Sequence, residues 1–129
     1  MRARLAPDSA AVGRALAAAR RFAEAARLDP TAADRLAIVV EEWVGNVVDH
    51  GGAAPGSRID LALARERSLV RLTVSDAGAP FDPRTAGFEG PNLERGGGAG
   101  LALIAAWTRV ADYRRRGGRN HLVFEMPLP

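Results

Sequence analysis

The sequence contains no cysteine among its 129 residues, so disulfides, thiolate catalysis and zinc–cysteine sites are excluded. Long hydrophobic runs are missing too, and no apolar stretch reaches the length of a membrane-spanning helix. The first residues lack the apolar centre of a secretory signal. We therefore expect a cytoplasmic protein without a membrane partner.

Lysine is also absent, and all 18 basic residues are arginines. This excludes a Walker-type phosphate-binding lysine, the strand lysine of protein kinases and Schiff-base chemistry. Any bound phosphate must be held by backbone amides, arginine or a metal ion. The net charge of +3 and the pI near 10.8 would suit nucleic acid, but aromatic residues make up only 5% and most arginines are scattered. We interpret the charge as a basic surface and expect no nucleic-acid partner.

The order of the expected elements predicts an α+β fold. Strong helix formers and apolar periodicity predict two helices first, and alternating patterns then predict two antiparallel hairpins around a long loop and a short helix. Strands that follow helices and are joined by hairpins indicate a two-layer sandwich, with helices on one face of a mixed, largely antiparallel sheet. We expect one domain over 1–129, with helices at 8–28, 31–50 and 100–109, strands at 57–66, 68–76, 110–116 and 120–128, and a loop at 77–98.

The second predicted helix carries a polar stripe. Glu42, Asn46 and His50 are four residues apart, so they share one slowly winding face, with Asp49 beside it. Taken alone, this pattern favours a plain solvated face of an amphipathic helix. Gly45 destabilises the helix by about 1 kcal/mol relative to alanine, which indicates that another group approaches the helix closely at this position. The opposite side of the helix is expected in the core: Leu36, Val40, Trp43, Val44, Val47 and Val48.

Asp76 stands at the end of a predicted strand whose core residues are Val70, Leu72 and Val74. An ionised carboxylate only accepts hydrogen bonds, so Asp76 suits a donor such as the exocyclic amine of adenine. Gly78 would let the backbone approach a flat ring closely. A plain Asp–Gly turn after a strand is the alternative.

Glycines run directly into the short predicted helix. Such a segment exposes backbone amides at the positive end of a helix dipole, which can cradle phosphate without lysine. A flexible linker is the alternative. Arg95, just before the glycines, either reaches the terminal phosphate or remains a solvated arginine. The candidate phosphate-binding residues are Gly96, Gly97, Gly98, Ala99, Gly100 and Leu101.

The three stretches together define one nucleotide site. Asp76 would hold adenine and the glycines the phosphates. Asn46 offers the neutral oxygen that magnesium can take beside phosphate oxygens. Glu42, one turn earlier, can position or deprotonate an attacking hydroxyl. His50 would shape the end of the helix and the pocket rather than transfer protons.

These stretches resemble the N, G1 and G2 boxes of the GHKL ATP-binding superfamily, and most closely those of small anti-sigma-factor serine kinases. The matching residues are Glu42, Asn46 and His50; Asp76, Gly78, Pro80, Phe81, Asp82 and Pro83; Gly98, Gly100 and Leu101; and a closing "GGRN" at 117–120. Trp43 departs from the family's usual small residue, and Arg109 stands where an acidic residue is common.

The resemblance implies a Bergerat-type fold, ATP and Mg²⁺ as ligands, and phosphorylation of a serine on a STAS-type anti-anti-sigma protein. It also implies a sigma-factor partner and a possible homodimer. Asp49, His50, Pro80 and Phe81 join the nucleotide-binding residues, although the ring of Phe81 is expected in the core, as is that of Trp107.

Two other functions stay open. One is a nucleotide-dependent sensor that binds a partner without phosphotransfer, which would not need a base at Glu42. The other is a detached histidine-kinase ATP domain, which the short loop and the lack of a phosphoacceptor helix argue against.

Overall fold

The computed structural model describes residues 1–51, 56–86 and 98–129. No helix within these ranges is long and apolar enough to cross a membrane. The described elements are β1 (Arg2–Leu5), α1 (Ala11–Ala25), α2 (Pro30–His50), β2 (Ile59–Glu66), β3 (Leu69–Asp76), α3 (Pro83–Ala86), α4 (Gly98–Trp107), β4 (Arg109–Arg116) and β5 (Arg119–Pro127).

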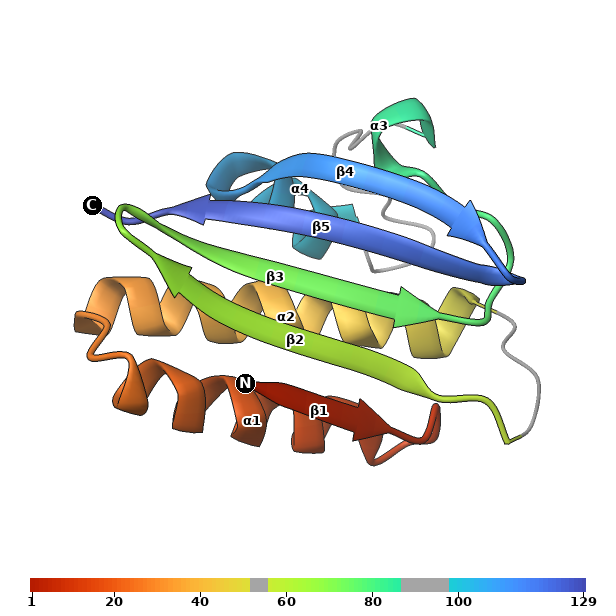
Figure 1. Cartoon of the computed structure of the whole chain (residues 1–129), viewed down its shortest axis with the longest axis horizontal. Helices are drawn as coiled ribbons and strands as arrows, with labels where there is room; N and C mark the ends of the chain where they lie inside the picture. Colours follow the sequence, from red (N-terminus) through yellow and green to blue (C-terminus); the bar gives the residue numbers. More distant parts are fainter. Residues whose placement is uncertain (52–55, 87–97) are drawn as a thin grey trace.

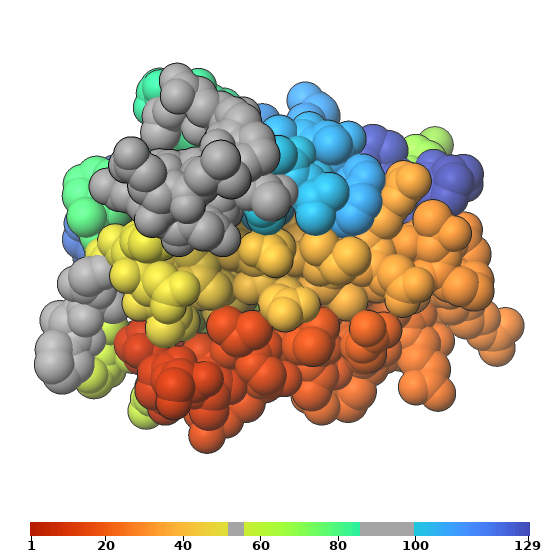
Figure 2. Space-filling model, turned by 180° about the vertical axis from the view of Figure 1, so that it is seen from behind, coloured from red at the N-terminus to blue at the C-terminus, as the bar shows by residue number. Residues whose placement is uncertain are grey.

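The five strands form one sheet in the order β1-β2-β3-β5-β4. All described pairings are antiparallel, where a mixed, largely antiparallel sheet had been expected. Helices α1, α2 and α4 lie on one face of this sheet (Figure 1). Seen from behind, α2 crosses the middle of that layer between α1 and α4 (Figure 2). The predicted α+β sandwich is therefore confirmed.

Local chemistry sets the bounds of α2. The Asp29 side chain accepts a hydrogen bond from the Ala32 amide at 2.8 Å, and Pro30 occupies the first turn, where its missing N–H costs nothing. The helix ends at His50, and the Gly51 amide donates to the Val47 carbonyl at 2.8 Å. The polar stripe thus ends with the helix, at His50.

The core side of α2 is confirmed by burial. Trp43 is 3% exposed and packs edge-on against Phe124 of β5, with ring centroids 5.3 Å apart. Val48 is only half-buried, at the margin of this core. The other buried α2 side chains among those expected are Leu36, Val40, Val44 and Val47.

Two expectations about individual residues are wrong. Phe81 was expected in the core but is 37% exposed, with its ring 5.9 Å from that of Trp43. A Cβ at Gly45 would meet nothing nearer than Val12 Cγ2 at 3.8 Å, an ordinary contact. No close approach therefore requires glycine at position 45.

Element bounds also differ from the prediction. Strand β1 was missed, and α1 is shorter than expected because Arg27 adopts a left-handed φ of 55° just after the helix. Helix α4 both starts and ends two residues earlier than expected. It ends at Trp107, so Arg109 begins β4 instead of ending a helix. The short α3 lies inside the predicted loop.

The β4–β5 hairpin turns at two glycines, Gly117 and Gly118, with φ of 59° and 75°. Left-handed values at both positions are typical of tight hairpin turns, and glycine adopts them without steric cost. After this turn, β5 pairs with β3 in a register that places Asn120 opposite Asp76. This pairing joins the "GGRN" motif to the candidate adenine residue.

Candidate functional site

Three chain segments meet at one end of the sheet: the end of α2, the end of β3 and the β4–β5 turn (Figure 1). The Ala79 amide, just past β3, donates to the Gly51 carbonyl at the end of α2 at 2.7 Å. The fold therefore brings Asp76 and the polar end of α2 together, as the sequence predicted.

The Asp76 carboxylate is held by one of its oxygens. Oδ1 accepts from the Gly78 amide at 2.9 Å and from Asn120 Nδ2 at 3.1 Å. Asp76 is 5% exposed, and among the described residues no hydrogen bond reaches its Oδ2. The second oxygen is thus the one available to a ligand donor.

Asn120 contacts the candidate site directly but was not among the predicted site residues, although its motif had been noticed. It is 5% exposed and uses both ends of its amide. Nδ2 also donates to the Ala79 carbonyl at 2.9 Å, while Oδ1 accepts from the Phe81 amide at 3.3 Å and the Tyr113 hydroxyl at 2.5 Å. Asn120 therefore ties β3, the following loop and β4 into one network.

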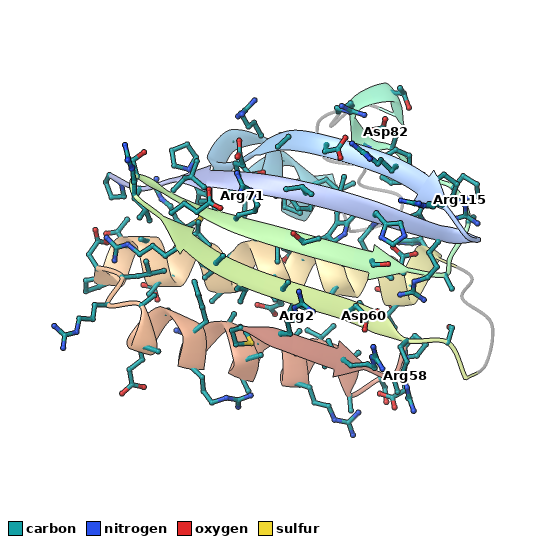
Figure 3. The ribbon with its side chains drawn as sticks, viewed as in Figure 1. Arg2, Arg58, Asp60, Arg71, Asp82 and Arg115 are labelled. Atoms are coloured by element: carbon teal, nitrogen blue, oxygen red, sulfur yellow. The ribbon has the colours of Figure 1, made fainter. Side chains whose placement is uncertain are left out.

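The packing of Gly78 gives a second reason for glycine at this position, beside the expected approach to a ligand ring. A Cβ there would lie 2.4 Å from the Gly51 carbonyl oxygen, so backbone packing against α2 already excludes a side chain. Arg115, which lies on β4, donates a hydrogen bond to the Gly78 carbonyl with a length of 2.7 Å (Figure 3). Arg115 thus holds in place the turn that follows Asp76.

Glu42 lies against the first turn of α4. A Cβ at Gly100 would come within 1.9 Å of Glu42 Oε2 and 2.5 Å of its Cδ. Glu42 is half-buried and Gly100 is buried. The predicted base and the predicted phosphate-binding turn are therefore direct neighbours, because α2 packs on α4.

The other predicted residues occupy more varied surroundings. Asn46 is half-buried on the same helix face as Glu42, whereas Asp49 and His50 are exposed on the last turn of α2. Pro80 is exposed, and Leu101 is half-buried against the core.

Several predicted residues cannot be placed in the site. Arg95, Gly96 and Gly97 lie outside the described residues. Gly98 and Ala99 open α4, and the surroundings of the Ala99 side chain lie outside the described part as well. Their proposed contacts with phosphate stay predictions.

The residues of the candidate site could hold a magnesium ion through one protein ligand only. Among the described residues, no group of three or more histidine, aspartate or glutamate side chains could hold a metal ion alone. The amide oxygen of Asn46 can serve as a single protein ligand for an ion that takes its other ligands from phosphate and water. Asn46 therefore fits magnesium only together with a phosphorylated ligand.

A cavity of about 620 Å³ lies on the other face of the sheet, over β1, β2 and β3 (Figure 3). In its lining, Asp60 accepts from Arg4 Nε at 3.0 Å, and Asp60 also lies 3.5 Å from Nη2 of Arg119. The sheet separates it from Asp76, whose side chain lies on the helix side with Val74. We therefore place the candidate site at the helix side.

Comparison with known proteins identifies the class. Residues 5–126 match the family of histidine kinase-like ATPase domains, and the chain belongs to that family. The serine/threonine-protein kinase BtrW of Bordetella bronchiseptica is 36% identical over 95 residues, which cover 67% of this chain and 65% of that protein.

Solved structures share the fold at low sequence identity. The catalytic domain of histidine kinase ThkA superposes with a TM-score of 0.58 at 14% identity, over 99% of this chain and 98% of that domain. A histidine kinase domain from Erythrobacter litoralis superposes with a TM-score of 0.54 at 20% identity, over 74% of this chain and 44% of its own length. The match to BtrW likewise spans less than two thirds of that protein.

Proposed function

We propose that this protein is a cytoplasmic, ATP-dependent serine/threonine kinase of the anti-sigma type. It would phosphorylate a serine of a STAS-type anti-anti-sigma protein and bind a sigma-factor-like partner, with a homodimer as a possible assembly. The family match, the similarity to BtrW and the contact between Glu42 and Gly100 support this proposal.

The observation that carries the proposal is the position of Glu42. Its carboxylate lies against Gly100 in the first turn of α4, where helix amides favour negative charge such as phosphate. A protein that only senses nucleotide needs no carboxylate at the phosphate end. A kinase does, because a serine hydroxyl must lose its proton as it attacks.

Each residue has one task in this proposal. Asp76 Oδ2 accepts the exocyclic amine of adenine, and the amides at the start of α4 face the phosphates. Asn46 would hold magnesium, which neutralises phosphate charge when bound. Glu42 takes the proton of the serine hydroxyl.

The direct test mixes the protein with labelled ATP, magnesium and a cognate STAS-type protein. We expect label on a serine of that protein, and none when this serine is replaced by alanine. A matched reaction without the kinase shows whether the STAS-type protein takes up label by itself. ATP-dependent binding of the partner without any label transfer would instead establish the sensor function, the second candidate.

A further inference from the structure

The hydrogen bonds of Asn120 bear on which base the site accepts. This inference rests on the proposed function, because it concerns the nucleotide that Asp76 would hold. It deepens that proposal by assigning a residue to base selectivity.

The orientation of the Asn120 amide is fixed by its partners. Nδ2 faces Asp76 Oδ1 at 3.1 Å and the Ala79 carbonyl at 2.9 Å, which both only accept. Oδ1 faces the Phe81 amide at 3.3 Å, which only donates, and it accepts from the Tyr113 hydroxyl. A flipped amide would oppose acceptor to acceptor and donor to donor. At 5% exposure, Asn120 has no spare donor for a ligand.

These contacts divide the Asp76 carboxylate into two unequal oxygens. A carboxylate oxygen has two lone pairs, and those of Oδ1 are taken by Gly78 and Asn120. Only Oδ2 can then accept from a base. The Asp76 carboxylate therefore accepts from a base through one oxygen only and cannot act as a bidentate acceptor.

Adenine and guanine differ in what they need from such a group. Adenine presents one amino donor beside a ring acceptor, so one carboxylate oxygen satisfies it. Guanine presents two adjacent donors, which a carboxylate binds well only when both oxygens are available. Because Gly78 and Asn120 occupy Oδ1 of Asp76, guanine cannot make the bidentate contact that would favour it.

We propose that Asn120 is a positioning residue that selects adenine over guanine by occupying Asp76 Oδ1. The test compares the affinities for Mg-ATP and Mg-GTP by calorimetry. Asn120→Leu keeps the size of the side chain but frees Oδ1, and Asn120→Ser does so with less apolar bulk. We expect the ATP-to-GTP affinity ratio to fall about tenfold in these variants, the equivalent of one hydrogen bond.

Tyr113→Phe is the matched control. It removes the hydroxyl that donates to Asn120 Oδ1 but leaves the bond from Asn120 to Asp76. Its ATP-to-GTP ratio should stay within about twofold of the parent's, although its melting temperature falls by a few degrees through the lost hydrogen bond.

The outcomes separate this inference from the proposed function. An unchanged ratio in a folded Asn120 variant that still binds ATP would overturn the selectivity role alone. An equal loss in Tyr113→Phe would also overturn it, since the network as a whole would then be responsible. If the parent binds neither nucleotide, the proposed function fails and the selectivity role fails with it.

Discussion

Replacing Gly100 by alanine perturbs Glu42 while adding a single methyl group to the chain. The new Cβ would lie 1.9 Å from Glu42 Oε2, 2.5 Å from Cδ and 3.0 Å from Cγ. An ordinary contact begins at 3.4 Å, so the nearest oxygen must move away by 3.4 − 1.9 = 1.5 Å. The clash involves the far end of a flexible side chain, so the fold can adapt and the carboxylate takes the displacement.

Two energies decide the stability of Gly100→Ala. Alanine inside a helix gains about 0.5–1 kcal/mol over glycine. An unfavourable Glu42 rotamer costs about 0.5–1.5 kcal/mol. These contributions nearly cancel, so we expect a melting temperature within a few degrees of the parent's.

The effect on phosphotransfer should be much larger. A displacement of about 1 Å in a catalytic group can cost about 10²-fold in rate, so we expect a loss of this order under single-turnover conditions. ATP affinity, measured by calorimetry, should change far less. Gly45→Ala is the matched control, because its Cβ meets only Val12 Cγ2 at 3.8 Å. If Gly100→Ala transfers phosphate as fast as Gly45→Ala, the position of Glu42 does not govern the chemistry.

Three further predictions concern Asp76, Asn46 and Glu125. Asp76→Asn should weaken ATP binding by about 1–3 kcal/mol in calorimetry, because an amide donor can then face the adenine amine; unchanged affinity would remove Asp76 from the adenine site. Asn46→Ala should abolish the difference between ATP titrations with magnesium and with EDTA, and a surviving difference would make Asp49 the next candidate ligand. Glu125 accepts hydrogen bonds from Arg71, at 2.7 Å, and from Arg109. The bond from Arg71 has the larger effect, and both lower the pKa of Glu125 from its ordinary 4.5. That stabilisation is present above 4.5 and lost as the pH falls through the lowered pKa, so acid titration of unfolding should be flatter in Glu125→Gln. Equal slopes in the two proteins would contradict this assignment.

The sequence was most informative where periodicity and motif agreed. The alternation of β3 and the apolar side of α2 predicted the core, since burial imposes those patterns. Strand β1 was missed because four residues hold too little pattern, and the strand depends on backbone pairing with β2. The start of α4 was displaced for a similar reason, because glycine gives no propensity signal for a helix.

The site was predicted in outline but not in its supporting contacts. Asp76 and Glu42 stand in recognisable motifs, so their places could be inferred. The clamp by Arg115 and the network around Asn120 depend on the β3–β5 register and on tertiary contacts between distant residues. The need for glycine at position 78 comes from the Gly51 carbonyl, which no local pattern reveals.

Glu42→Gln tests the central claim most directly, because it keeps the shape of the side chain and removes only its basicity. The measurement pairs calorimetric binding of Mg-ATP with single-turnover transfer to the STAS-type protein, for the parent and the variant. We predict nearly equal ATP affinity and a transfer rate lower by about 10²–10⁴ in Glu42→Gln. Equal transfer rates in the two proteins would contradict the role of Glu42 as the base.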